Sequence, residues 1–165
     1  MPSGLFIQAC LMALKPMRSN RILQLIPAIH VSQAICQEII RSYRRQLTVP
    51  EDDCPPQIKR VVETIHRDLF RKPIGIYELK VQCNFGSKGY SGKFKYYVGR
   101  TPKDYILHHQ CELAKQLLSD PRLSEFNCLE VGIAIGFQSL SSFSMAFKSR
   151  TGYSPSEWRS RNLEG

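Results

Sequence analysis

The sequence predicts an all-α protein in which two helix-turn-helix units are joined by a long linker helix and preceded by a helical N-terminal extension. Three observations predict this fold. A string of residues occurs twice, signals for helix ends and helix starts lie within both copies, and helix formers outweigh the β-branched and aromatic runs of a sheet protein. The repeat is the most informative of the three.

The repeated string begins at Phe94 and returns 53 residues later at Phe147. Both copies read Phe-Lys-x-x-x-Gly-x-Thr/Ser-Pro-x-acid-aromatic, and in the same register Tyr90 falls on Phe143. The glycine is typical of a helix end, and the hydroxyl residue, proline and acid are typical of the cap, first and third positions of the next helix. We interpret the string as an internal duplication of one helical unit.

The N-terminal part of the chain is predicted to be helical from Ile22 to Leu47. Ile35, Ile39 and Ile40 share one face of this segment, and Pro27 is expected to break or kink it early. The acidic, double-proline stretch 51–56 then predicts a linker and a new helix start. We therefore divide the chain into an extension, residues 1–55, and a domain, residues 56–165.

Seven helices are expected in residues 56–165. The first carries one apolar stripe at helical spacing, made by Ile58, Val61, Val62, Ile65 and Leu69, and Lys72-Pro73 ends it. The others are expected at 76–83, 87–97, 102–118, 127–135, 139–148 and from 154 onward. The short loops at 84–86 and 136–137 connect the helices of each helix-turn-helix unit, and Asn127 with Glu130 forms a capping box.

Charge and composition indicate the kind of partner. The chain has 165 residues, 42% of them hydrophobic, with a net charge of +9 and a pI near 9.4, which favours a polyanion or an anionic surface. From Pro56 onward there are 17 Lys and Arg against 10 Asp and Glu, so the basic excess lies in the duplicated part. A soluble basic protein without an anionic target remains the alternative on charge alone.

The six cysteines form no C-x-x-C pair and have no histidine pairs at ligand spacing. His108 and His109 are adjacent, so on a helix they point about 100° apart and chelate poorly. We therefore expect no metal and no cofactor. We also expect no membrane span, because the apolar run Leu5–Leu14 is too short for one and lacks the cationic start of a signal peptide. A reducing, cytoplasmic location near the nucleoid is expected.

A short helix, a tight turn and a second helix in a basic protein is the layout that presents one helix to the DNA major groove. Residues 58–161 closely resemble the DNA-binding domain of the AraC/XylS family of bacterial transcription regulators. The similarity is densest in EVGIAIGFQSLSSFSMAFKSRTGYSPSEWR, from Glu130 to Arg159, and departs from the family pattern chiefly at Gly132, where Ala is usual. The resemblance implies a reader of double-stranded DNA whose two recognition helices enter major-groove segments about 34 Å apart.

The resemblance also implies which residues of the second recognition helix contact DNA. Those expected to face the groove are Leu140, Ser141, Ser144 and Met145. Ser139 and Lys148 are expected near phosphates. Met145 cannot make a bidentate contact to guanine, which leaves apolar contact with a thymine methyl. Three phenylalanines fit the core between helices rather than a base-stacking surface, namely Phe137, Phe143 and Phe147.

The first unit departs further from the family pattern. Its recognition helix should present Lys88, Ser91 and Gly92 to the groove and Lys95 to the backbone. Glycines recur at 86, 89 and 92, and each interior glycine costs about 1 kcal/mol of helix stability relative to alanine. Lys80 also occupies a corner where the family prefers a small residue. We infer a looser first unit that mainly holds phosphates, while the second unit reads bases.

The expected function is that of a sequence-specific transcription regulator, and by analogy activation is its commoner mode. Catalysis is disfavoured, because no catalytic constellation shows a plausible spacing and GSKGYSG lacks the end of a phosphate loop. A degenerate helix-turn-helix module that docks on RNA polymerase or another regulator stays open. Residues 1–50 could form a homodimer, be the remnant of a longer sensor, or pack on the helix at 58–69.

Overall fold

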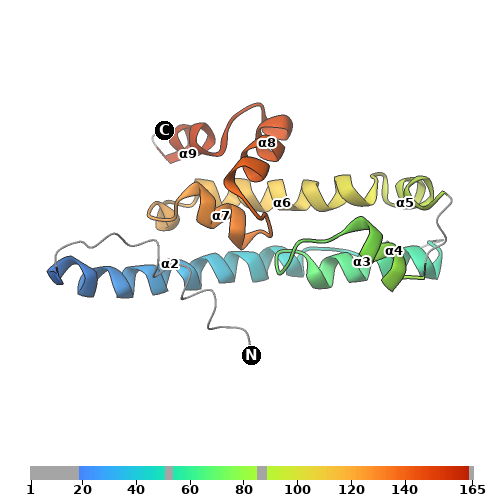
Figure 1. Cartoon of the computed structure of the whole chain (residues 1–165), viewed down its shortest axis with the longest axis horizontal. Coiled ribbons are helices and arrows are strands. Elements are labelled where there is room, and N and C mark those ends of the chain that lie inside the picture. The colour runs from blue at the N-terminus through green and yellow to red at the C-terminus, as the bar shows by residue number, and fades with distance from the viewer. Residues whose placement is uncertain (1–18, 51–53, 85–88, 164–165) are drawn as a thin grey trace.

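The computed structural model describes residues 19–50, 54–84 and 89–163, and all its regular structure is helical (Figure 1). The helices are α2 (Ser19–Arg45), α3 (Pro56–Asp68), α4 (Ile76–Gln82), α5 (Tyr90–Val98), α6 (Pro102–Ser119), the 3-10 helix η1 (Pro121–Leu123), α7 (Cys128–Ala134), α8 (Leu140–Thr151) and α9 (Pro155–Leu163). The predicted fold class is confirmed. Helices α4 and α5 form the first unit, α7 and α8 the second, and α6 joins them.

The duplication is visible in the helix boundaries. Helices α4 and α7 have seven residues each, and α6 and α9 both begin at the proline of the repeat. The helices before them, α5 and α8, end at Gly99 and Gly152, whose φ angles are 79° and 80°. Such left-handed angles suit glycine, which has no Cβ. The predicted helix-end and helix-start signals are therefore confirmed in both copies.

The two copies differ at the start of the second helix. We expected a helix from about Ser87, but α5 begins at Tyr90, after Gly89 in a left-handed conformation with φ 76°. A positive φ cannot be part of a right-handed helix, so Gly89 precedes α5 instead of weakening its interior. Helix α8 begins at Leu140, three positions earlier in the register of the repeat, so it has an additional turn at its N-terminal end.

Helix α6 forms the centre of the domain. Thr101 caps it by accepting a hydrogen bond from the Asp104 backbone N–H at 3.3 Å. Its buried residues are Pro102, Tyr105, Ile106, Gln110, Cys111, Leu113, Ala114, Leu117 and Leu118. The first unit packs on its N-terminal end through Phe94 and Tyr105, whose ring centroids lie 5.9 Å apart. At its other end, the Trp158 indole donates a hydrogen bond to Ser119 Oγ at 3.1 Å.

The predicted core and capping of the second unit are confirmed. Phe143 and Phe147 are fully buried, and the half-buried Phe137 packs on Phe143 with ring centroids 5.3 Å apart. Asn127 Oδ1 accepts from the Glu130 backbone N–H at 2.9 Å, and Glu130 Oε2 accepts from the Asn127 N–H at 2.7 Å. This reciprocal capping box fixes the start of α7.

Helix α2 runs beside α6, and its N-terminal end reaches past the other helices in Figure 1. We expected Pro27 to break or kink this segment; a break is wrong, because α2 continues through Pro27 from Ser19 to Arg45. A proline removes one backbone hydrogen bond and clashes with the preceding turn, but the remaining bonds of a long helix can carry it past that point.

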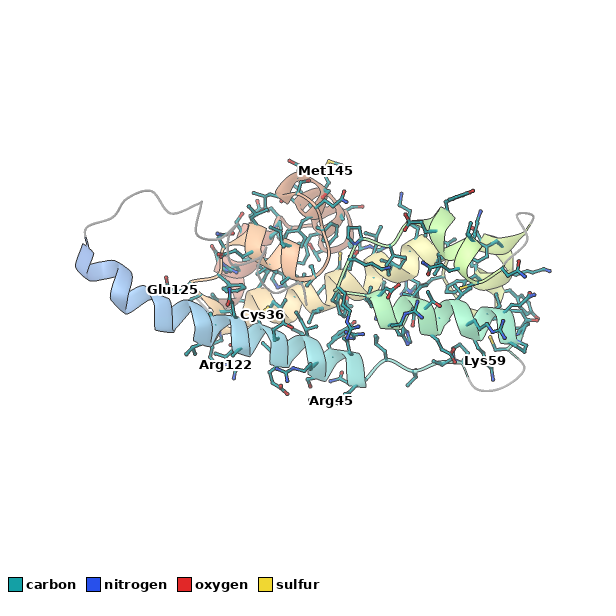
Figure 2. The ribbon with its side chains drawn as sticks, turned by 60° about the horizontal axis from the view of Figure 1, so that its bottom comes forward. Cys36, Arg45, Lys59, Arg122, Glu125 and Met145 are labelled. Carbon is teal, nitrogen blue, oxygen red and sulfur yellow. The ribbon has the colours of Figure 1, made fainter. Side chains whose placement is uncertain are left out.

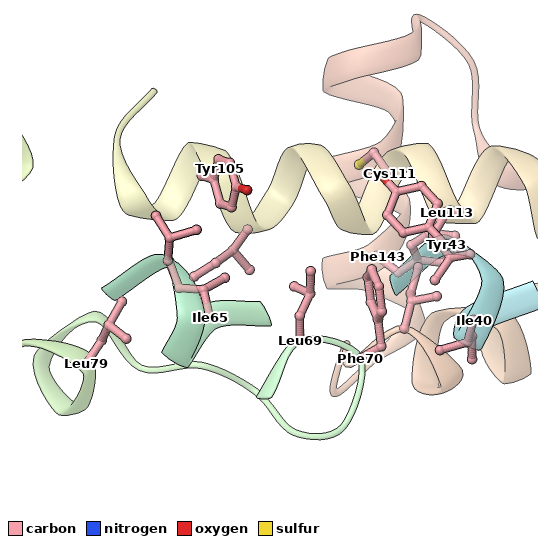
Figure 3. Close-up of a cluster of buried hydrophobic side chains, with 14 of the residues drawn as sticks. Ile40, Tyr43, Ile65, Leu69, Phe70, Leu79, Tyr105, Cys111, Leu113 and Phe143 are labelled. Atoms are coloured by element: carbon pink, nitrogen blue, oxygen red, sulfur yellow. The ribbon is translucent and has the colours of Figure 1, made fainter. Parts of the chain in front are cut away.

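The C-terminal half of α2 belongs to the same hydrophobic cluster as the helices that follow it (Figure 3). Cys36, Ile40 and Tyr43 are buried there, and the Tyr43 and Phe70 ring centroids lie 5.7 Å apart. Arg44 Nη2 donates to the backbone oxygens of His66 at 3.0 Å and Arg67 at 2.8 Å. A cationic group there is favourable, because these carbonyls belong to the last turn of α3.

Within the described part of the chain, no helix is both long enough and apolar enough to cross a membrane.

Candidate nucleic-acid interface

One face of α8 is buried and the other is exposed. The buried face carries Phe143 and Phe147, which are fully inaccessible to solvent. Of the predicted groove-facing residues, Leu140 is 44% and Met145 74% exposed, Ser141 is exposed, and Ser144 is half-buried. Figure 2 shows Met145 at the outer edge of the molecule, on the side away from α2. The structure therefore leaves this face of α8 open to a partner.

The predicted phosphate-contacting residues of the second unit lie at the two ends of α8. Ser139 is its cap: the Ser139 hydroxyl oxygen accepts from the Ser142 backbone N–H at 3.2 Å. The same hydroxyl lies 3.0 Å from Ser142 Oγ, so it holds the helix start in place. Lys148 is exposed in the last turn. The start of a helix presents backbone N–H groups and positive potential, which suit a phosphate.

The first unit presents a shorter helix with smaller side chains. Ser91, Gly92 and Lys95 are exposed, on the side opposite the buried Tyr90 and Phe94. Lys88, the other residue predicted to contact DNA, lies outside the described residues. The repeat register pairs Ser91 with Ser144, Gly92 with Met145 and Lys95 with Lys148, so the structure brings corresponding positions of both units to corresponding helix faces.

The corners of the two units are packed differently. In the second unit, Gly132 lies so close to Phe143 that a Cβ atom added to it would be 3.0 Å from the ring carbon Cδ1. In the first unit, Lys80 occupies the corresponding place and its Nζ lies 5.3 Å from the centroid of the Tyr90 ring, a cation–π contact. A long side chain over an aromatic ring thus stands where the second unit has a close glycine contact. The looser first unit stays a prediction.

One ionic contact near the interface had no signal in the sequence. Arg150, near the end of α8, donates to the Asp104 carboxylate and, at 3.3 Å, to the Asp104 backbone oxygen. Arg100 also donates to this carboxylate, at 3.3 Å. The hydrogen bond from Arg150 is the main reason that the pKa of Asp104 lies below its usual value.

A second group that sequence reasoning missed lies between α2, α3 and α6. The Tyr43 hydroxyl is 3.0 Å from His109 Nδ1, and His66 Nε2 is 2.7 Å from the Tyr105 hydroxyl. Burial lowers the pKa of His109 to about 4, with smaller contributions from His108 and His66. In the described ranges no group of His, Cys, Asp or Glu side chains could hold a metal ion. These groups join the helices rather than form a ligand site.

The fold and the exposed helix faces define a class of protein, the double helix-turn-helix proteins with one connecting helix. Residues 82–161 match a family profile described as a helix-turn-helix domain. The described fold is similar to the DNA-binding domain of AdpA, solved in complex with a target DNA, with a TM-score of 0.56 and 19% identity over 69% of this chain and 93% of that one. An AraC-type regulator from Chromobacterium violaceum gives a TM-score of 0.52 and 22% identity over 66% and 94%.

Two curated proteins of similar sequence are named as regulators. HTH-type transcriptional regulator AlkR of Acinetobacter baylyi is 27% identical over 137 residues, which is 81% of this chain and 44% of that protein. The MmsAB operon regulatory protein of Pseudomonas aeruginosa is 31% identical over 99 residues, 60% and 31% respectively. The chain thus spans less than half the length of these two relatives. Residues 82–161 are just under half of the chain, and for this part the resemblance to AraC-type helix-turn-helix domains that the sequence predicted is confirmed.

Proposed function

We propose that the protein binds double-stranded DNA in a sequence-specific manner and regulates transcription, with α5 and α8 entering two adjacent major-groove segments. The observation that carries this proposal is the equivalence of the two helices. Both end at a left-handed glycine, both expose the face that carries the corresponding repeat positions, and both pack on α6. One rigid helix between two recognition helices suits a duplex read from one side.

In this proposal the second unit reads bases. Leu140 and Met145 offer apolar contact to thymine methyl groups, and Ser141 and Ser144 offer hydroxyls to base edges. The first unit mainly holds phosphates through Lys88 and Lys95. Support for this division comes from the short α5, whose Gly92 has no side chain to reach a base.

The base-reading role is tested by selecting preferred sites from random duplexes with the purified chain. Leu140→Ala and Ser141→Ala should each lower discrimination at one base position by about 10-fold, because a good base contact is worth about 1 to 3 kcal/mol. Ser160→Ala, an exposed serine on α9, is the matched control and should leave the selected motif unchanged. If Leu140→Ala and Ser141→Ala keep the motif while Lys88→Ala relaxes it, the assignment of the two units is reversed.

A second candidate function is a contact with RNA polymerase or another regulator. It is favoured by large apolar side chains on the outer face of α4, where Tyr77 is 80% and Val81 62% exposed. Their counterparts on α7, Leu129 and Ile133, are 40% and 38% exposed. As part of an activator, this face would touch polymerase while α5 and α8 hold DNA. A protein that only docks on polymerase would enrich no DNA motif in the same selection.

A homodimer through residues 1–50 is a separate proposal. The buried face of α2 that carries Cys36, Ile40 and Tyr43 is used within the chain. A dimer would therefore use another part of this segment, such as the region around Val31, which is 58% exposed. The mass of the chain in solution, measured with and without residues 1–31, distinguishes a monomer from a dimer that forms through this region.

A further inference from the structure

Asp104 contacts one arginine in the segment after α5 and one arginine on α8. It is in the first turn of α6, directly after the segment that ends α5, and its carboxylate accepts a hydrogen bond from Arg100 at 3.3 Å. The same carboxylate accepts from Arg150, one residue before the end of α8. One carboxylate therefore connects the C-terminal end of the second recognition helix to the segment that follows the first.

The contact is less exposed on its arginine side than an ordinary surface ion pair. The Arg150 side chain is only 24% exposed, and the same guanidinium nitrogen reaches both the Asp104 carboxylate and, at 3.3 Å, its backbone oxygen. Charge-assisted hydrogen bonds of this kind are short and directional. The pair of Asp104 with Arg100 is more open, with side chains 41% and 43% exposed, and contributes less.

This pair belongs to the junction of the units and not to the repeat itself. In the repeat register Tyr97 corresponds to Arg150, and Glu157 corresponds to Asp104. Glu157 serves its own helix, since its carboxylate accepts from the Ser154 backbone N–H at 2.6 Å. The repeat contains no second copy of the Asp104–Arg150 contact. We therefore expect this contact to affect how the two copies are placed relative to each other.

Other polar contacts between α6 and the helices that follow it lie farther from the first unit. Gln110 Nε2 donates to the Ile135 backbone oxygen at 2.9 Å, and Cys111 Sγ lies 3.9 Å from the Ala146 backbone oxygen of α8. The Trp158 indole of α9 donates to Ser119 at the far end of α6. Among the described residues, the hydrogen bonds from Arg150 to Asp104 are the ones that join α8 to the end of α6 where α5 meets it.

We propose that Asp104 and Arg150 are a positioning pair that sets the distance and angle between α5 and α8, and thereby the number of base pairs between the two half-sites. This inference rests on the proposed DNA-binding function. One inserted base pair moves the second half-site by about 3.4 Å and rotates it by about 34° around the duplex. A rigidly placed pair of helices cannot follow that shift, so it loses the gain from binding both half-sites at once.

The test compares duplexes that carry the selected half-sites at the preferred spacing and at one base pair more or less. The wild-type chain should lose about 10-fold in affinity at either changed spacing. Asp104→Ala and Arg150→Met should each reduce that loss to about 3-fold or less, and the double variant should match the single ones, because both remove one contact. Arg150→Lys, which keeps the charge without the planar fork, should lie between wild type and Arg150→Met.

The deciding readout is the ratio of the affinities for duplexes with the preferred and the changed spacing, since a change of charge alone alters the affinity for all duplexes alike. Unchanged spacing selectivity in both single variants, with unchanged thermal stability, overturns the proposal. Additive effects in the double variant also overturn it. Residual dipolar couplings of the DNA-free chain give an independent result: the angle between α5 and α8 should be less defined in the variants. Equal couplings in wild type and variants contradict the positioning role even if the chain binds no DNA.

Discussion

Phe143→Ala is expected to lower the free energy of unfolding by about 4 kcal/mol, which is the scale observed when a large aromatic side chain is removed from a packed core. Phe143 is fully buried, and its ring centroid lies 5.3 Å from that of Phe137 and 5.6 Å from that of Phe147. Gly132 also packs directly against the ring, so neighbouring side chains cannot easily collapse into the space. Urea unfolding followed by circular dichroism measures the change.

The matched control is Met145→Ala, two residues farther along the same helix. Met145 is 74% exposed, so this change should alter stability by less than about 0.5 kcal/mol. For the choice of DNA motif we expect the larger direct effect from Met145→Ala, because this substitution should change the preferred motif without unfolding the domain. A Phe143→Ala variant that loses less than about 1 kcal/mol would contradict the packing described for the second unit.

Stability is also expected to fall as the pH is lowered from about 6.5 towards about 4. Burial lowers the pKa of His109 from 6.5 to about 4 and lowers the pKa of His66 as well. The unfolded chain therefore binds protons on these rings before the folded chain does, and each proton bound favours unfolding. The stabilisation by neutral His109 is complete above pH 6.5 and decreases progressively as the pH falls from there towards about 4.

Carboxylates act in a separate range of pH. Hydrogen bonds from Arg150, Arg67 and Arg122 lower the pKa values of Asp104, Asp68 and Asp120 below the ordinary value of 3.8. Their stabilising effect is present above that value and is lost only as the pH falls further. His109→Gln should therefore flatten the stability profile between pH 6.5 and 4 and leave the acid limb in place. An equally steep profile in that variant would exclude His109 as the cause.

Local signals in the sequence predicted most of the fold. A glycine that ends a helix, followed by a hydroxyl cap, proline and acid, specifies one short stretch of backbone, and both copies of it formed as expected at Gly99 and Gly152. The apolar stripe of α3 and the phenylalanines of α8 likewise predicted the core, since helical spacing decides which side chains share a face. The exception was the start of α5, where the conformation of Gly89 decided the boundary.

Contacts between distant segments could not be predicted in this way. The partners Asp104 and Arg150 are 46 residues apart, and Tyr43 and His109 are 66 residues apart. No periodicity within one helix indicates such a pair, because it depends on how the helices cross. The continuation of α2 through Pro27 is a similar case, as the helix is set by more than its local preference.

Hydroxyl-radical footprinting on a selected duplex tests most directly whether the two units bind the same DNA duplex at the same time. We expect two protected windows on the same face, about 34 Å apart along the duplex, and protection that weakens steeply with salt as phosphate contacts release counterions. Protection of a single window, or no protection at any salt concentration, would contradict the proposal that α5 and α8 bind two adjacent major-groove segments.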